Sequence, residues 1–184
     1  MINQLIIKGF KSFVDKSINF NQLNVLTGLN SSGKSTVIQA LQILSKYSRH
    51  FENPLIEGHG DYKELQNPFS SLPFSINAKY GEHGIICYSP QKENNIHTEE
   101  FPDLIIISAD RYGPLVSIPL LSDCELGSKG ENVIKCIQVH ENDILDKLIT
   151  HPNSEGDTFL YNLRAWLGTI TPGVQFNYDI IDKA

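Results

Sequence analysis

One short stretch constrains the fold of this 184-residue chain more than any other. Residues 28–35 read Gly-Leu-Asn-Ser-Ser-Gly-Lys-Ser and fit the phosphate-binding loop pattern G-x-x-x-x-G-K-[ST] without a gap. The glycines of this pattern allow the backbone to curl, so that several N–H groups point into one hollow. The pattern therefore predicts a loop that binds phosphate groups.

The flanks of this loop strengthen the prediction. Residues 23–27 before it are mostly apolar and predict a buried strand, while Val37, Ala40, Leu41 and Leu44 after it recur at the spacing of one helix face. A strand, a glycine loop and a helix in this order direct a helix N-terminus at an anion. The alternative, a glycine-rich turn with a surface lysine, does not account for these flanks.

Each position of the loop receives an expected role. Lys34 is expected to reach the β- and γ-phosphates of a nucleotide and is the predicted catalytic residue, and the Ser35 hydroxyl is the predicted Mg²⁺ ligand. The predicted nucleotide-binding residues are Gly28, Asn30, Ser31, Ser32, Gly33, Lys34, Ser35 and Thr36. ATP and Mg²⁺ are therefore the expected ligands.

Composition narrows the class of protein. The length predicts one domain with a sizeable core, and the chain has no run of eighteen apolar residues and no signal-peptide pattern, so a cytoplasmic protein without a membrane segment is expected. The net charge of −6 argues against a broad electrostatic DNA-binding surface, although it leaves room for a local basic patch.

The remaining secondary structure follows from periodicity. Strands are predicted within residues 2–20 as a pair, at 74–80, at 85–88 and at 104–107, the last as a strand buried on both faces. Helices are predicted at 131–140, 143–149 and 159–170, the last with Asp157 or Thr158 as its cap. Residues 50–73 read as a loop, and apolar residues alternate from 174 to 180.

The segments 9–13, 23–28 and 30–36 together resemble the opening of ABC-class P-loop ATPases of the SMC, RecF and OLD type. Segments 107–114 and 127–132 further resemble the middle of bacterial AAA-type ATPases that carry a C-terminal domain of unknown function and occur in anti-phage defence and retron-like loci. The resemblance implies an α/β P-loop lobe with an N-terminal antiparallel subsheet and a helical second half. It also implies a homodimer in which two heads sandwich ATP, and Lys11 close to the nucleotide.

This resemblance predicts how the chain is divided into segments and which ATPase motifs it lacks. Residues 1–184 form one ATP-binding lobe, with a β-hairpin, P-loop strand and helix in 1–50, a loop and antiparallel strands in 51–110, and a mainly helical insertion in 111–184. No Walker B acidic pair, signature loop or switch histidine follows the P-loop. The chain is therefore expected to be incomplete without a C-terminal half and not to hydrolyse ATP alone.

Several polar residues near these motifs are each open to two interpretations. Lys11 is equally well explained as a solvated hairpin lysine, and Asn30 either faces a partner subunit's γ-phosphate or shapes the loop, which is favoured. Asp61 and Gln66 fall where a contact to Mg²⁺ or water is possible, but a polar surface is favoured.

The second half offers weaker candidates. Asp110 and Arg111 are expected to form a structural ion pair rather than a contact across a dimer. Gly127, Gly130 and Glu131 are expected in a turn that starts a helix, and Trp166 is expected in the core.

The expected function is ATP binding and, in the complete protein, ATP hydrolysis that drives a nucleotide-dependent switch in a DNA-acting or anti-phage defence assembly. The alternative is a scaffold with little turnover that assembles a separate nuclease or toxin effector. A P-loop kinase or GTPase is disfavoured, since no guanine-type Asn-Lys-x-Asp sequence is present.

Overall fold

The computed structural model describes the chain except for residues 50–52, 57, 91–94, 111–123, 125 and 180–184. It divides into two compact units, Met1–Leu104 and Ile105–Ala184. The first unit contains the phosphate-loop segment.

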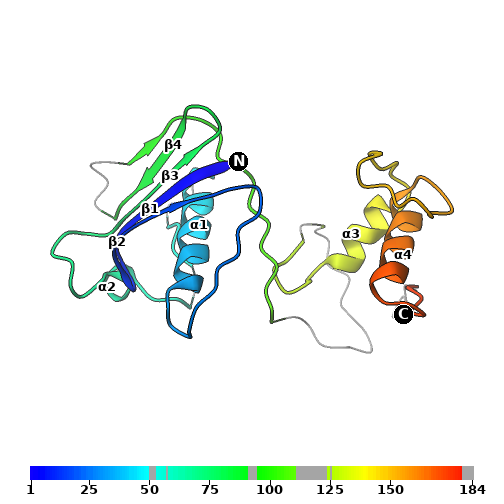
Figure 1. The fold of residues 1–184 in the computed structure, drawn as a ribbon, viewed down its shortest axis with the longest axis horizontal. Coiled ribbons are helices and arrows are strands. Elements are labelled where there is room, and N and C mark those ends of the chain that lie inside the picture. Colours follow the sequence, from blue (N-terminus) through cyan, green and yellow to red (C-terminus); the bar gives the residue numbers. More distant parts are fainter. Residues whose placement is uncertain (50–52, 57, 91–94, 111–123, 125, 180–184) are drawn as a thin grey trace, which may run out of the picture. The chain divides into compact units, whose positions relative to one another are not determined.

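The first unit is built on an antiparallel sheet of order β2-β1-β3-β4-β5 (Figure 1). Its strands are β1 (Ile2–Phe10), β2 (Phe13–Asn19), β3 (Ser75–Tyr80), β4 (Gly84–Tyr88) and β5 (Ile96–His97). Alternation of side chains decides which face is buried: Leu5 and Ile7 of β1 lie level with Ala78 and Ile76 of β3, and all four are buried. The predicted strand pair in 2–20 and the strands near 74–80 and 85–88 are therefore confirmed.

The helix α1 (Lys34–Ser48) covers the buried face of this sheet (Figure 1). Val37, Ala40 and Leu44 are at most 3% exposed, as expected for residues that recur on one helix face. Each large apolar side chain buried in this way contributes about 1.5–3 kcal/mol relative to an exposed one. A short helix α2 (Tyr62–Leu65), absent from the predictions, follows within the expected loop region.

The second unit contains the helices α3 (Val133–His140) and α4 (Phe159–Ile170), which contact each other. Asn162 of α4 is fully buried: its side chain accepts from the His151 N–H and donates to the carbonyl oxygens of Gly156 and Thr158. The helices predicted at 131–140 and 159–170 are confirmed, and Thr158 is the N-cap of α4, although its side chain makes no capping hydrogen bond.

Two predicted buried strands are wrong in the described structure. Residues 23–27 and 104–107 form no strand or helix, and Leu23, Val25 and Ile105 are all at least 76% exposed. An apolar run becomes a buried strand only when neighbouring strands pair with it on both sides. Among the described residues no strand pairs with either segment.

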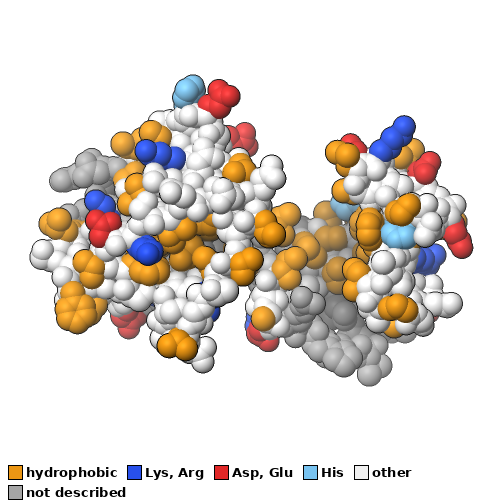
Figure 2. Space-filling view, viewed as in Figure 1, with side chains coloured by type: hydrophobic (Ala, Val, Ile, Leu, Met, Phe, Trp, Pro, Cys, Tyr) orange, Lys and Arg blue, Asp and Glu red, His pale blue; other side chains and the backbone are white. Residues whose placement is uncertain are grey.

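Two expectations for the second unit are also wrong. Residues 143–149 form a bridge and a turn instead of a helix, because the Asp146 carboxylate accepts from the Leu148 N–H and competes with helical bonding. Trp166 is 42% exposed and donates from its ring N–H to the Ile149 carbonyl, so it is not a core residue. Figure 2 shows hydrophobic side chains reaching the visible surface of both units.

Candidate functional site

The backbone of residues 28–33 curls as the loop pattern requires. Gly28, Ser31 and Gly33 have φ values of 147°, 64° and 95°, a region that favours glycine. A Cβ on Gly33 would also lie 2.5 Å from the ring of Phe13, and one on Gly28 would lie 2.7 Å from the Ser32 hydroxyl. Gly33 is therefore required by conformation and by space, and Gly28 by its conformation.

The Lys34 side chain folds back over this loop. Its ammonium group donates to the carbonyl oxygens of Gly28 (2.9 Å) and Leu29 (2.7 Å) and lies 3.4 Å from the Ser32 hydroxyl. These acceptors are neutral, and charge-assisted hydrogen bonds to phosphate oxygens are stronger. The arrangement holds a cation at the loop, where an anionic group competes favourably for it.

The N-terminus of α1 opens at the same place. Gly33 is its N-cap, no side chain caps it, and its first turn contains no acidic residue. The N–H groups of Lys34, Ser35 and Thr36 have no partner within the helix, and the helix dipole places partial positive charge on them. Free donors and positive potential at one helix end suit a phosphate group.

The turn between β1 and β2 packs against the loop. The Phe13 ring lies against Gly33, and the Ser12 hydroxyl is 3.5 Å from the Thr36 hydroxyl. Lys11 donates from its ammonium group to the Gln39 side-chain oxygen at 2.7 Å. The hairpin turn and the first turns of α1 therefore form one site.

Comparison with known proteins shows the family to which this chain belongs. Residues 1–164, which include the loop, the hairpin and most of the second unit, match the AAA ATPase domain family. This chain belongs to the AAA ATPase domain family.

Two curated proteins are similar to parts of the chain. It is 30% identical over 83 residues to the DNA replication and repair protein RecF of Oenococcus oeni, covering 41% of this chain and 22% of that protein. It is 43% identical over 51 residues to an ATP/GTP phosphatase of Helicobacter pylori, covering 27% of this chain and 14% of that protein. The chain thus spans less than a quarter of either relative, and the similarity supports the resemblance to RecF-type P-loop ATPases.

Within this family context, Ser35 and Thr36 have different surroundings. Ser35 is exposed at the start of α1, whereas Thr36 is 7% exposed and faces Ser12. Mg²⁺ prefers hard oxygen ligands and commonly takes one or two from protein, with phosphates and water completing its shell. The exposed Ser35 hydroxyl fits that requirement.

The other predicted loop residues have modest contacts. Asn30, Ser31 and Ser32 are exposed, and the Ser32 N–H donates to the Leu29 carbonyl at 3.2 Å, which closes the turn. Their contacts to nucleotide, like those of Lys34, Ser35 and Lys11, remain predictions.

Asp61 and Gln66 have structural roles in the AAA ATPase domain. The Asp61 carboxylate caps α2 by accepting from the Lys63 and Glu64 N–H groups. The Gln66 side chain accepts from the Phe74 N–H and donates to the Leu72 carbonyl. Neither side chain is directed to the phosphate loop by these bonds.

In the second unit, Asp110 pairs with Lys129 at 2.6 Å, and Arg111 lies outside the described residues. The Gly130 N–H donates to the Gly127 carbonyl in the expected turn, and the Lys129 N–H donates to Glu131. α3 begins just after this turn, at Val133.

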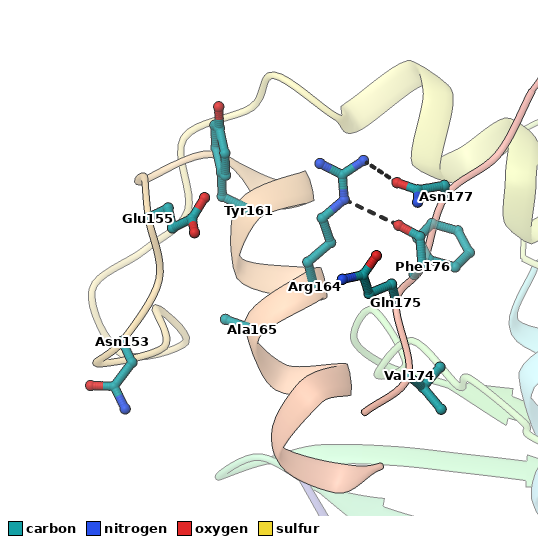
Figure 3. Close-up of a pocket in the computed structure, with 9 residues that line it drawn as sticks. All are labelled: Asn153, Glu155, Tyr161, Arg164, Ala165, Val174, Gln175, Phe176 and Asn177. Atoms are coloured by element: carbon teal, nitrogen blue, oxygen red, sulfur yellow. Dashed lines mark hydrogen bonds between the residues drawn. The ribbon is translucent and has the colours of Figure 1, made fainter. Parts of the chain in front are cut away.

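A separate pocket lies beside α4 (Figure 3). Arg164 points across it and donates to the Phe176 carbonyl and to the Asn177 side chain, which fixes the segment after α4. No residue predicted to bind nucleotide lines this pocket.

Sequence reasoning missed Gln39 and His59, which extend the site beyond Lys11. The position of Gln39, four residues after Ser35, was the available signal, because such residues share a helix face.

No helix among the described residues is long and apolar enough to cross a membrane.

Proposed function

We propose that this chain is the nucleotide-holding part of an ATPase that binds Mg-ATP at residues 28–36. The observation that carries the proposal is the Lys34 ammonium group, held over the loop by the Gly28 and Leu29 carbonyls next to the uncapped N-terminus of α1. The match to the AAA ATPase domain family supports the same conclusion.

The residues of the site suit phosphoryl transfer, a reaction catalysed mainly by positioning and charge neutralisation. In the proposed reaction Lys34 exchanges its carbonyl partners for oxygens of the β- and γ-phosphates, and the N–H groups of the loop and of α1 donate to the phosphates. Ser35 is the residue that would hold Mg²⁺, which supplies neutralisation of phosphate charge when bound.

The role in a larger assembly is also a proposal. The likeness to a protein named for DNA replication and repair supports a switch that acts on DNA, and it favours the switch over the low-turnover scaffold. The exposure of the loop residues supports a homodimer in which a second copy closes over the nucleotide. A role in anti-phage defence and a cytoplasmic location remain predictions from the sequence.

Calorimetric titration of ATP into the whole protein tests nucleotide binding. Lys34→Ala should remove most of the affinity, because a charge-assisted phosphate contact contributes roughly 1.5–3 kcal/mol. Lys16→Ala, which removes an exposed lysine of β2, is the matched control and should bind normally. Equal affinities of the Lys34→Ala and wild-type proteins would refute the assignment.

Steady-state ATP turnover, measured with and without DNA, distinguishes the DNA-acting switch from the low-turnover scaffold. An active switch predicts turnover that depends on Lys34 and responds to DNA. A scaffold predicts tight ATP binding with negligible turnover under both conditions. Residues 1–184 alone are expected to show no turnover, and turnover by this segment that Lys34→Ala abolishes would contradict that expectation.

A further inference from the structure

The turn at Lys11 is held in a strained conformation. Lys11 has a φ of 49°, which is unusual for a residue with a side chain. Its N–H donates to the Leu65 carbonyl at 2.8 Å, and its carbonyl accepts from the Asn67 side chain at 2.6 Å. The two backbone groups are thus fixed on the last residue of α2 and on the segment just after it, which gives the Lys11 side chain a defined direction.

A chain of hydrogen bonds leads from that side chain to His59. The Lys11 ammonium donates to the Gln39 oxygen at 2.7 Å, and the Gln39 nitrogen lies 3.0 Å from His59 Nδ1. Because an ammonium group only donates, the Gln39 oxygen must face Lys11 and its NH₂ group must donate to His59. His59 Nδ1 is therefore an acceptor, and the orientation of the Gln39 amide is determined at both ends.

The charge on Lys11 lacks a counter-ion among the described residues. None of the ion pairs found there includes Lys11, and its hydrogen-bond partner is a neutral amide. Partial burial lowers the pKa of Lys11, which shows that the charged form is poorly solvated. An approaching anion would supply the missing compensation.

The position of this lysine relates it to the phosphate loop. Gln39 lies four residues after Ser35 and three after Thr36, so its side chain is next to both positions on the surface of α1. Ser12, the neighbour of Lys11, is next to both Gly33 and Thr36. The Lys11 ammonium, bonded to Gln39, thus lies about one turn along α1 from Ser35 and Thr36, which are proposed to bind the nucleotide.

We propose that Gln39 is a positioning residue of the nucleotide site: it holds the Lys11 ammonium group beside α1, ready to pass to the terminal phosphate of a bound nucleoside triphosphate. His59 keeps the Gln39 amide in the orientation that presents its oxygen to Lys11. This inference rests on the proposed function, since it concerns the same nucleotide. It assigns to Gln39 an effect that operates only through Lys11.

Calorimetric affinities of the whole protein for ATP and ADP test the inference. Lys11→Met should weaken ATP binding by about tenfold, the typical effect of losing one charge-assisted contact. Gln39→Leu should weaken it less, since the lysine remains but loses its support. Gln39→Glu should be worse than Gln39→Leu, because a carboxylate pairs with Lys11 and repels phosphate. ADP, which lacks the terminal phosphate, should be affected less in every case.

The decisive comparison is a double-mutant cycle. In the Lys11→Met background, Gln39→Leu should cause no further loss of ATP affinity, because it acts through Lys11. Gln42→Leu is the matched control: Gln42 lies on the same helix, makes none of the side-chain hydrogen bonds found in the described residues, and should leave affinity unchanged.

Additive losses in the cycle, or equal losses for ATP and ADP, would overturn the inference. Should Gln39→Leu fail to fold, Gln39→Asn, which shortens the side chain by one methylene, takes its place in the same cycle. The Lys34→Ala protein distinguishes failure of the role of Gln39 from failure of the proposed function. Loss of ATP binding in Lys34→Ala without any effect at Gln39 rejects only the inference, whereas normal binding by Lys34→Ala rejects the proposed function.

Discussion

The two units of this chain are stabilised in different ways. The sheet and α1 of the first unit enclose a continuous apolar core that includes Phe10, Phe74 and Leu44, all fully buried. In the described part of the second unit, Ile137 is the only buried hydrophobic side chain, and the fully buried residue is the polar Asn162. Apolar burial therefore dominates in the first unit and specific hydrogen bonds in the second. The phosphate loop belongs to the unit with the stronger core.

The largest expected effect comes from removing an aromatic core residue. Phe10→Ala should lower the free energy of unfolding of the first unit by about 3–5 kcal/mol, since it removes buried surface and leaves a cavity. Chemical denaturation combined with hydrogen exchange resolved along the chain measures this. Phe69→Ala, at a side chain that is 86% exposed, should change little. Similar losses in both variants would show that the apolar cluster is not the main support of this unit.

Bound nucleotide should increase the difference in stability between the two units. ATP with Mg²⁺ at one hundred times its Kd should stabilise the first unit by about 2.7 kcal/mol through mass action. All predicted binding residues lie before residue 37, so added exchange protection should be concentrated in residues 1–104. Lys34→Ala removes the protection if the assignment holds. Protection confined to the second unit would place the ligand elsewhere.

A smaller effect is expected from the buried amide of the second unit. Asn162→Ala leaves the His151 N–H and two carbonyl oxygens without their partner, which should cost about 1–3 kcal/mol. Asn142→Ala, at an exposed site, is the control. Exchange rates around α4 report the result, and unchanged rates in Asn162→Ala would mean that this unit does not depend on its polar core.

The smallest effect on stability is expected at Ser35. Ser35→Ala removes an exposed hydroxyl and should leave unfolding within about 0.5 kcal/mol of wild type. It should nevertheless weaken ATP binding in the presence of Mg²⁺ more than in EDTA, because only a metal ligand is lost. Titration under both conditions decides this, and an equal loss in both would exclude Ser35 as the ligand.

The sequence predicted correctly those elements whose conformation is determined by nearby residues. The spacing of Val37, Ala40 and Leu44 indicated α1, and the glycine pattern indicated the curled loop. The alternation around Ile76 and Ala78 likewise indicated β3. In each case the periodicity of side chains or the conformational freedom of glycine is set within a few residues.

The errors arose where distant partners decide the structure. An apolar composition at residues 23–27 predicts burial only if other strands are present to pair with it. One further error is local: at 143–149 the Asp146 carboxylate accepts from the Leu148 N–H and competes with helical hydrogen bonds. The contact of Lys11 with Gln39 joins residues 28 positions apart, and no local pattern records it.

The contact between Gly33 and the Phe13 ring has a consequence for protein engineering. The loop is often treated as a portable motif, but here its tightest glycine is shaped against a hairpin twenty positions earlier in the chain. A graft of residues 28–36 into a new scaffold would lose that surface and need a substitute for the aromatic ring. The transferable unit is the hairpin turn, the loop and the first turns of α1 taken together.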